Sequence, residues 1–282
     1  MTHGLQSVAG RVALVTGAAS GLGRATAALL QKRGARLVLC DLDGAALEKT
    51  ARDLSNGSGG SRRVPPLAET VDVTNGDDVG RFAARVAREV GAPELLVNAA
   101  GVLVVGRFLD TPADDWAHVI DVNLKGPANV CRAFLPSMLE RGRGGYVVNV
   151  ASASAFVTPR ELCAYGATKH ALVGLSQGLK DELHVHGIGV SVVCPGFVNT
   201  PILERARIRG DDAEELRRSA AALLRVRLSP ERVAERIVRA AERGHSFVPV
   251  GLEAHALWLL ARLSPVGAAR VFGLIRRIGS RT

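Results

Sequence analysis

The sequence lacks the features of disulfide-rich, zinc-binding and membrane-spanning proteins. Its four cysteines show no CxxC spacing and no Cys/His cluster, so no metal site is expected and the thiols are expected to be free. No uninterrupted apolar run reaches the roughly 18 residues of a membrane-spanning helix. The N-terminal residues also lack the basic and apolar regions of a signal peptide. These absences together predict a reducing, cytoplasmic location.

Lysine and aromatic residues are also scarce. Only five of the 36 basic residues are lysines, and aromatic residues make up 4% of the chain. The net charge is +9, but residues 251–282 carry five arginines against one glutamate, a disproportionate share. With the excess at one end, and with no expected reading helix or aromatic platform, nucleic-acid binding is not predicted.

Apolar β-rich runs alternate with helical stretches along most of the 282 residues. Strands are expected at 11–16, 36–41, a run ending at 69–73, 94–98, 145–151, 189–194 and 246–250. Helices are expected at 22–33, 44–54, a stretch ending near 90, 113–139, 164–184 and 230–243. Near-continuous apolar strands separated by helices indicate a parallel sheet covered on both faces. The predicted fold class is therefore α/β, a doubly wound Rossmann-type sheet.

No linker interrupts this alternation before about residue 250. We therefore expect one domain over 1–250, with a substrate lid at about 197–228, and a helical C-terminal extension at 251–282. In the extension, Val271, Leu274, Ile275 and Ile278 form an i, i+3, i+4, i+7 stripe. This basic amphipathic segment could pack on the lid or on another subunit, or lie on an anionic membrane surface. An apolar tail near the lid would also suit a lipophilic substrate.

The most distinctive local motif follows the first expected strand. Residues 16–23 read TGAASGLG, which places Gly17, Gly21 and Gly23 in GxxxGxG spacing before an expected helix. Glycines allow the backbone to approach a pyrophosphate, and the helix N-terminus adds N–H donors and partial positive charge. Alone the motif could be an ordinary tight turn, but its strand–turn–helix context favours a dinucleotide site.

An acidic residue ends the second expected strand, 18 residues after the last glycine of that turn. This residue, Asp41, is placed to bind the ribose hydroxyls of an adenosine and to repel a 2′-phosphate. Neither Leu42 nor Ser20 is basic, so NAD(H) is expected rather than NADP(H). Arg24 and Arg36 are nearby cations that could reverse this preference.

Tyr165 and Lys169 are four residues apart on an expected helix, so they share one face. A tyrosine with its ordinary pKa of ~10 is a poor acid–base group, but a nearby ammonium is expected to lower that pKa. The pair is then a candidate general acid/base. Ser152 follows the fifth expected strand and Asn123 lies in the preceding long helix, although both could also be ordinary polar residues.

Taken together, these motifs resemble the short-chain dehydrogenase/reductase family in its compact single-domain branch. The matches occur in family order over about residues 8–250: TGAASGLG, Asp41, Asp72-Val73, Asn98-Ala99-Ala100-Gly101, Asn123, Ser152, Tyr165-x-x-x-Lys169 and Pro195-Gly196. Ala99 departs from the second asparagine of the family's NNAG motif. The resemblance implies cofactor contacts at Gly17, Ser20, Gly21, Leu22, Gly23, Asp41, Leu42, Asp72, Val73, Asn98, Ala99, Ala100, Gly101, Tyr165, Lys169, Pro195, Gly196, Val198 and Thr200.

The resemblance also implies a role for each candidate catalytic residue. Tyr165 is expected to donate or accept the proton, Lys169 to hold the nicotinamide ribose, Ser152 to orient the substrate oxygen, and Asn123 to anchor a water relay. A homotetramer or homodimer built on the helices that contain Asn123 and Tyr165 is also implied.

The predicted function is an NAD(H)-dependent oxidoreductase that interconverts a small-molecule alcohol and a ketone or aldehyde. An NADP(H)-dependent carbonyl reductase is one alternative. A non-catalytic dinucleotide-sensing or scaffold protein on the same fold is the other, although such a protein would be expected to have lost Tyr165 or Lys169.

Overall fold

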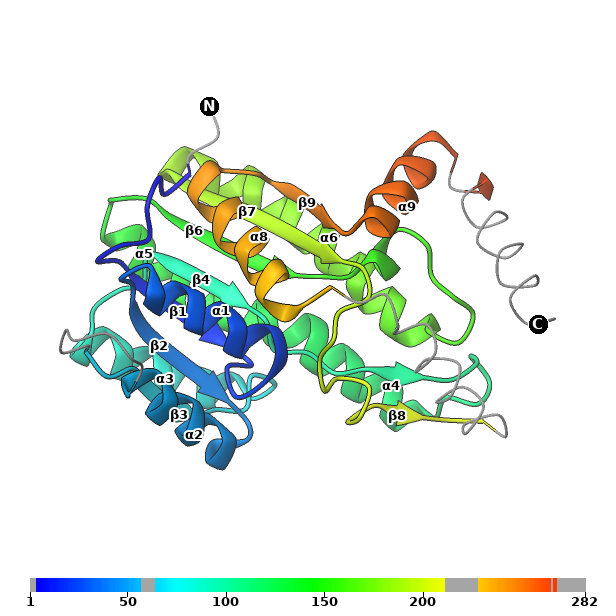
Figure 1. Ribbon diagram of the computed structural model, residues 1–282, viewed down its shortest axis with the longest axis horizontal. Coiled ribbons are helices and arrows are strands. Elements are labelled where there is room, and N and C mark those ends of the chain that lie inside the picture. The colour runs from blue at the N-terminus through cyan, green and yellow to red at the C-terminus, as the bar shows by residue number, and fades with distance from the viewer. Residues whose placement is uncertain (1–3, 57–63, 211–227, 265, 268–282) are drawn as a thin grey trace.

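The computed structural model describes residues 4–56, 64–210, 228–264 and 266–267 (Figure 1). Within these residues, a seven-stranded sheet has the order β3-β2-β1-β4-β6-β7-β9, and every pairing in it is parallel. Its strands are β1 (Val12–Thr16), β2 (Arg36–Asp41), β3 (Leu67–Thr70), β4 (Leu95–Asn98), β6 (Gly145–Val150), β7 (Ile188–Pro195) and β9 (Phe247–Val250). The predicted fold class is confirmed, including the edge strand near residue 250.

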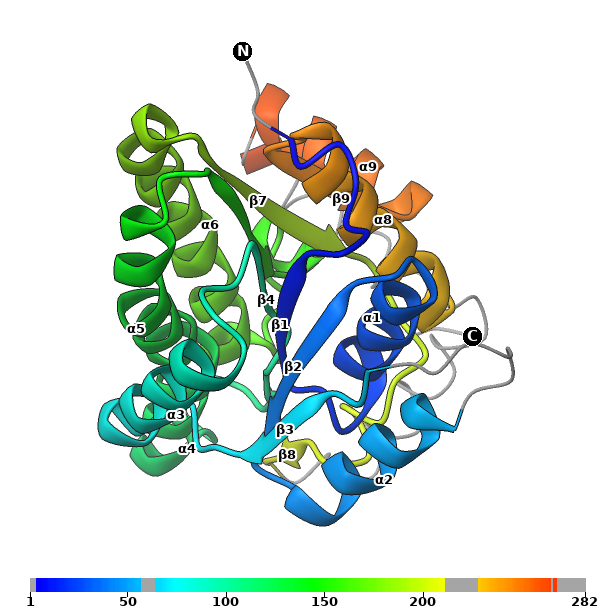
Figure 2. The same ribbon diagram turned by 90° about the vertical axis from the view of Figure 1, so that its left-hand side faces the viewer.

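Helices cover both faces of the sheet (Figure 2). Those of the described residues are α1 (Gly21–Lys32), α2 (Gly44–Ser55), α3 (Gly76–Glu89), α4 (Ala113–Ile120), α5 (Gly126–Glu140), α6 (Cys163–Leu183), α8 (Pro230–Arg243) and α9 (Leu252–Leu263). Apolar residues of α1, α2 and α8 pack on one face, and those of α3, α5 and α6 pack on the other.

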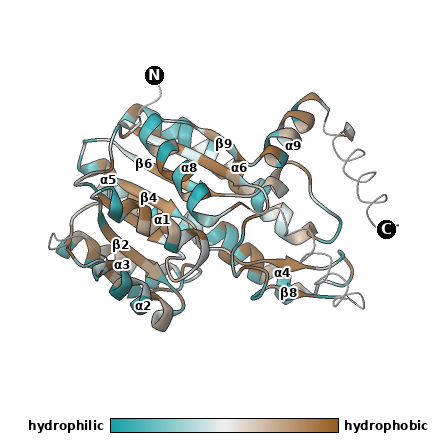
Figure 3. Cartoon of the chain, in the orientation of Figure 1, coloured by the Kyte–Doolittle hydropathy of each residue, from teal (hydrophilic) through white to brown (hydrophobic). Residues whose placement is uncertain are grey.

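The central strand β1 shows why its sequence is continuously apolar. Ala13 and Val15 belong to the core beneath α1 and α8, whereas Val12 and Leu14 belong to the core beneath α3 and α5. Successive side chains of a strand point to opposite faces, so both sets must be apolar in a doubly covered sheet. Figure 3 accordingly shows hydrophobic strands between helices that carry hydrophilic residues.

Local signals in the sequence define several helix ends. Asn75 accepts hydrogen bonds from the backbone N–H groups of Asp77 and Asp78 at the start of α3, and Ser229 accepts one from Arg232 at the start of α8. These N-caps satisfy donors that have no partner within the helix. Gly244 ends α8 with a φ of 74°, a conformation that glycine adopts without steric cost.

Two expected elements differ from the structure. The third strand ends at Thr70 rather than at 73. The long helix expected over 113–139 is divided into α4 and α5 by a π-helical turn over Asp121–Lys125. In a π-helix the backbone hydrogen bonds join residues five apart in the chain, one more than in an α-helix. Such turns occur often at functional sites. The turn contains Asn123.

Outside the main sheet, β5 (Val104–Val105) pairs in parallel with β8 (Arg207–Ile208). Sequence patterning did not predict this pair. It brings the start of the expected lid against the chain that follows β4. The lid residues 211–227 lie outside the described residues, as does the apolar stripe of the extension, and the division of the chain at residue 250 stays a prediction.

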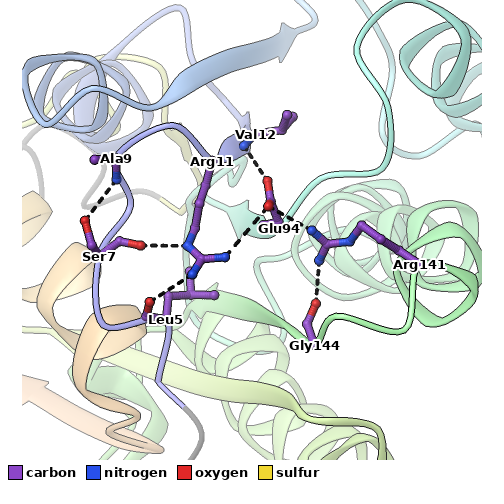
Figure 4. A network of polar contacts seen from close by, with 8 residues as sticks. All are labelled: Leu5, Ser7, Ala9, Arg11, Val12, Glu94, Arg141 and Gly144. Carbon is purple, nitrogen blue, oxygen red and sulfur yellow. Dashed lines mark hydrogen bonds and ion pairs between the residues drawn. The ribbon is translucent and has the colours of Figure 1, made fainter.

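The amino-terminal edge of the sheet is closed by a network of charged groups (Figure 4). The carboxylate of Glu94 accepts a 2.7 Å hydrogen bond from the N–H of Val12 and lies 2.9 Å from the Arg141 guanidinium and 3.7 Å from that of Arg11. Arg141 also donates to the carbonyl of Gly144. The beginnings of β1, β4 and β6 are thus fixed to one another, at the end of the sheet opposite the candidate site.

Candidate functional site

A cavity of about 510 Å³ lies at the carboxyl ends of the central strands. The chain winds outward from β1 through β2 to β3, and then from β4 through β6 and β7 to β9. The cavity therefore sits where the direction of strand order reverses, the usual ligand position in an open α/β sheet. Its lining includes Gly17, Ser20, Gly21, Leu22, Gly23, Asp41, Leu42, Asp72, Val73, Ala99, Ala100, Gly101, Tyr165, Lys169 and Thr200.

The glycine turn leaves no room for side chains. A Cβ atom at Gly23 would lie 2.0 Å from the carbonyl oxygen of Gly17, and one at Gly17 would lie 2.7 Å from backbone atoms of Ala100. Gly17 also has a φ of 68°, which side-chain-bearing residues rarely adopt. The turn is tied to the loop after β4, because the Thr16 hydroxyl accepts hydrogen bonds from the N–H groups of Ala99 and Ala100, both at 3.1 Å.

Asp41 lies at the end of β2 with its carboxylate directed to the glycine turn. One oxygen accepts a 2.9 Å bond from the N–H of Ala19, and the other accepts a 3.0 Å bond from the N–H of Asp43. Two cations considered from the sequence lie elsewhere, since Arg36 opens β2 at its far end and Arg24 pairs with Asp53 at 3.0 Å. Arg205 lines the cavity instead, 3.7 Å from Asp43.

Tyr165 and Lys169 both lie in α6, both are buried, and both line the cavity. The Lys169 ammonium is 5.6 Å from the centre of the Tyr165 ring and donates a 3.1 Å hydrogen bond to the carbonyl of Val150. Burial lowers the pKa of Lys169 to about 8.

The lowered pKa expected for Tyr165 is not found in the protein on its own. Burial raises the pKa of Tyr165 to about 12, and the hydrogen bond with Ser152 opposes this rise only in part. Taking a phenolate out of water is costly, and this cost is the main cause of the raised pKa. Tyr165 is therefore a neutral phenol at neutral pH.

Ser152 follows β6 and does not line this cavity. Its hydroxyl oxygen accepts a 3.2 Å bond from the N–H of Ser154, and it is hydrogen-bonded to Tyr165. The backbone N–H of Ser152 in turn bonds the buried thiol of Cys194 at the end of β7. Ser152 is thus held beside Tyr165 from two neighbouring strands.

Asn123 is buried and holds the chain after β4. Its Oδ1 accepts a 2.9 Å bond from the N–H of Val102, and its Nδ2 donates to the carbonyl of Val102 at 3.0 Å and to the Thr168 hydroxyl at 3.2 Å. Asn123 therefore links the π-helical turn, the cavity floor and α6. A Cβ atom at Gly101 would lie 3.3 Å from Asn123 Oδ1 and 3.6 Å from Lys169 Nζ.

Four other predicted cofactor residues do not line this cavity. Asn98 is buried, with its Nδ2 donating to Asn149 at 2.8 Å. Pro195 ends β7, and Gly196 and Val198 follow it. A Cβ atom at Gly196 would lie 2.0 Å from the Glu253 carboxylate of α9, so the extension reaches this loop.

Sequence reasoning missed several residues that line the cavity. They include Val71, Asp43, Val102, Leu103, His118, Val122, Val150, Ala151, Pro201, Ile202 and Arg205. His118 lies in α4, where burial and the charge of Arg207 lower its pKa. The sequence held no signal for His118 or Arg205, because no short spacing links α4 or the segment after β7 to the glycine turn. Others, such as Asp43 and Val71, adjoin predicted residues.

The fold and cavity define an α/β protein with a nucleotide-type cleft at its switch point. A family model described as short chain dehydrogenase matches residues 11–209. The chain belongs to the short-chain dehydrogenase family, and its resemblance to that family is confirmed.

Similar proteins extend this comparison. A protein named probable oxidoreductase EphD, from Mycobacterium tuberculosis, is 37% identical over 257 residues, which are 89% of this chain and 43% of that protein. The chain thus spans under half the length of these curated relatives. A 1-deoxy-11-beta-hydroxypentalenate dehydrogenase from Streptomyces exfoliatus is 39% identical over 69% of this chain and 70% of its own. A Burkholderia phymatum short-chain dehydrogenase/reductase, solved in complex with NAD, has a TM-score of 0.82, 31% identity, and coverage of 90% of this chain and 93% of its own.

Proposed function

We propose that this protein interconverts an alcohol and a ketone or aldehyde with NAD(H), using Tyr165 as the proton donor and acceptor. The observation that carries the proposal is that Tyr165 and Lys169 line the same cavity as the glycine turn and Asp41. A proton-transferring group and a dinucleotide-type cradle thus share one space. The complex of a similar short-chain dehydrogenase/reductase with NAD also supports NAD(H).

The residues present fit a dinucleotide. The glycines at 17 and 23 allow a close backbone turn, and Ser20 makes no side-chain hydrogen bond that caps the start of α1, which suits a pyrophosphate. Asp41 and the Asp72–Val73 pair would hold the adenosine, and Lys169 would hold the second ribose. When bound, the nicotinamide supplies the hydride donor or acceptor.

In the reducing direction, the neutral Tyr165 hydroxyl donates its proton to the carbonyl oxygen of the substrate as the carbonyl carbon receives a hydride. The Lys169 ammonium stabilises the phenolate that remains. Ser152 orients the substrate oxygen toward Tyr165. In the oxidising direction the phenolate accepts the proton of the alcohol, so the same groups serve both directions.

We propose NAD(H) over NADP(H) because Asp41 would repel a 2′-phosphate. Arg205 is the specific observation in favour of the alternative, since it lines the cavity near Asp43. Its guanidinium is shared with that carboxylate, which weakens its attraction for a further phosphate.

We also propose a lipophilic substrate. Phe156, which follows Ser152, lies 5.6 Å from Phe247, and Phe247 stacks on Trp258 of α9 at 5.8 Å between ring centres. Phe156 and Phe247 pack against a small core that includes Ala151, which lines the cavity, so this aromatic group would receive an apolar part of a substrate. Homo-oligomerisation and a cytoplasmic location stay predictions. Among the described residues there is no helix that could cross a bilayer. Peripheral membrane contact stays a prediction.

Tyr165→Phe tests the proposal. Oxidation and reduction are followed by the absorbance of the reduced nicotinamide, over a panel of secondary alcohols and ketones with both cofactors. We expect turnover to fall about 1,000-fold while NADH affinity changes less than about threefold, because the variant loses only the transferable proton. Tyr146→Phe is the control, since Tyr146 is the chain's other tyrosine and is buried with its hydroxyl accepting a bond from Ser191. Turnover by Tyr165→Phe within threefold of wild type would refute the proposed role.

A further inference from the structure

An ion-pair cluster outside the catalytic group joins α4 to the segment that follows β7. The carboxylate of Asp115 accepts a 2.8 Å bond from Arg207 Nη1, a 2.6 Å bond from Arg209 Nε and a 3.3 Å bond from Arg209 Nη2. The Asp115 side chain is only 2% exposed, whereas the two arginines are 42% and 45% exposed. Burying a carboxylate costs desolvation free energy, and charge-assisted hydrogen bonds from paired arginines offset that cost.

The two arginines flank Ile208, since Arg207 opens the short strand β8 and Arg209 follows it. The N–H of Arg207 donates to the carbonyl of Leu103 at 3.1 Å, and that of Arg209 donates to Val105 at 2.8 Å. Two residue pairs make a weak ladder on their own. The ion pairs with Asp115 therefore supply much of what keeps β8 against β5.

The strand β5 connects this cluster to the rest of the site. Gly101, on the cavity floor, precedes it by three residues. On the side away from β8, the N–H of Gly106 donates a 2.7 Å bond to the carbonyl of Glu161, just before α6 and Tyr165. A displacement of β8 would therefore also move β5, which is linked both to the cavity floor and to the chain just before α6.

The segment between Gly196 and β8 covers the cofactor cleft. Four of its residues line the cavity: Thr200, Pro201, Ile202 and Arg205. Thr200 lies over the glycine turn, since a Cβ atom at Gly21 would meet its side chain at 3.3 Å. Because Arg205 is two residues from Arg207, the position of this cover depends on where β8 is anchored.

We propose that Asp115 is a positioning residue which, through Arg207 and Arg209, holds residues 200–205 over the cofactor and slows the release of NADH. The inference rests on the proposed use of NAD(H). It assigns no chemistry to Asp115, which does not line the cavity. Because the release of cofactor limits turnover in many enzymes, the anchor would then set the rate of the catalytic cycle.

Asp115→Asn tests this inference by removing the charge and keeping the shape. NADH dissociation is measured by stopped-flow fluorescence, and hydrogen exchange is measured for peptides covering 203–210. We expect NADH to dissociate about tenfold faster and the Arg207 and Arg209 amides to exchange about tenfold faster. Asp114→Asn is the matched control, because Asp114 lies in the same first turn of α4 and is exposed. It makes the same charge change and should alter neither rate.

A conservative variant separates positioning from general destabilisation. Asp115→Glu keeps the charge and should restore a large part of the slow release, while Arg209→Lys loses the two-pronged contact and should accelerate release about threefold. Should Asp115→Asn fail to fold, Arg209→Lys carries the test. Wild-type protein that does not bind NADH would overturn the proposed function together with this inference. If wild type binds NADH and both variants release it at the wild-type rate, this inference alone is overturned.

Discussion

Two carboxylates, Asp41 and Asp115, hold opposite sides of the cleft with different donors. Asp41 accepts bonds from the backbone N–H groups of Ala19 and Asp43, within 22 residues of itself. Asp115 accepts bonds from the guanidinium groups of Arg207 and Arg209, which lie 92 and 94 residues away along the chain.

The difference between backbone and side-chain donors indicates which side of the cleft tolerates substitution. Backbone donors are present whatever the sequence, so the glycine-turn side depends on the absence of side chains at a few positions. The lid side depends on three particular side chains, any of which can be exchanged with a graded loss. We therefore expect the glycine-turn side to tolerate almost no substitution and the lid side to tune the kinetics of binding.

Gly23→Ala is expected to break the glycine-turn side most completely. Its Cβ would lie 2.0 Å from the carbonyl oxygen of Gly17, so the turn must shift as a whole. NADH affinity, measured by fluorescence titration, should fall at least about 100-fold. Gly80→Ala is the matched control, because Gly80 is exposed in α3 with no atom within 4 Å of the added Cβ. Wild-type affinity in Gly23→Ala would show that the turn can open without loss.

Lys169→Met extends the comparison from the two carboxylates to a buried ammonium. Among the contacts described, this ammonium has no carboxylate partner. Burial lowers its pKa from 10.5 to about 8. Between these values the unfolded chain binds more protons than the folded one, so folding stability rises with pH there, and below pH 8 the full cost of the buried charge is present. Removing the charge should stabilise the fold by on the order of 2 kcal/mol at pH 7, with the gain shrinking toward pH 10.5.

Urea unfolding at pH 7 and pH 9 measures this gain, and activity should be lost in the same variant. Lys180→Met is the control, since Lys180 lies in the same helix and is exposed. A destabilised Lys169→Met at pH 7 would mean that the hydrogen bond to Val150 outweighs the cost of burial.

Asp41→Asn sharpens the comparison with the smallest expected change. The amide oxygen can still accept one backbone N–H, so the turn should survive, but the repulsion of a 2′-phosphate is removed. The preference for NADH over NADPH, as a ratio of dissociation constants, should fall about tenfold. Asp53→Asn is a control on the exposed ion pair with Arg24, where no change is expected. An unchanged ratio in Asp41→Asn would assign cofactor choice to another group, with Arg205 the first to examine.

The parts of the fold that the sequence predicted are those specified by short-range patterns. The alternation of apolar strands and helices predicted the sheet, and GxxxGxG with Asp41 predicted one wall of the cavity. The pairing of β5 with β8 and the cluster around Asp115 were missed, because two-residue strands and contacts over 90 residues leave no periodicity. The break in the helix at Asn123 was also missed, because one extra residue in a single turn is too short a signal to detect in the apolar spacing of a long helix.

The expected lowering of the Tyr165 pKa was not found, and the reason is different. Spacing correctly put Tyr165 and Lys169 on one helix face, but spacing carries no information about burial. Both side chains are buried, and the loss of solvation disfavours the charged form of each of them. The acidity of a phenol depends on its surroundings in three dimensions, and these come from strands and loops distant in sequence.

The π-helical turn at Asp121–Lys125 has an evolutionary consequence. This turn contains one residue more than a regular α-helical turn. The side chains of α5 are therefore rotated by about 100° about the helix axis relative to those of α4. Asp115 can thus face the lid while Asn123 faces Val102 and α5 faces the core. A one-residue deletion in this turn would swing α4 and its anchor away from β8, so length here should be more strictly maintained than residue identity.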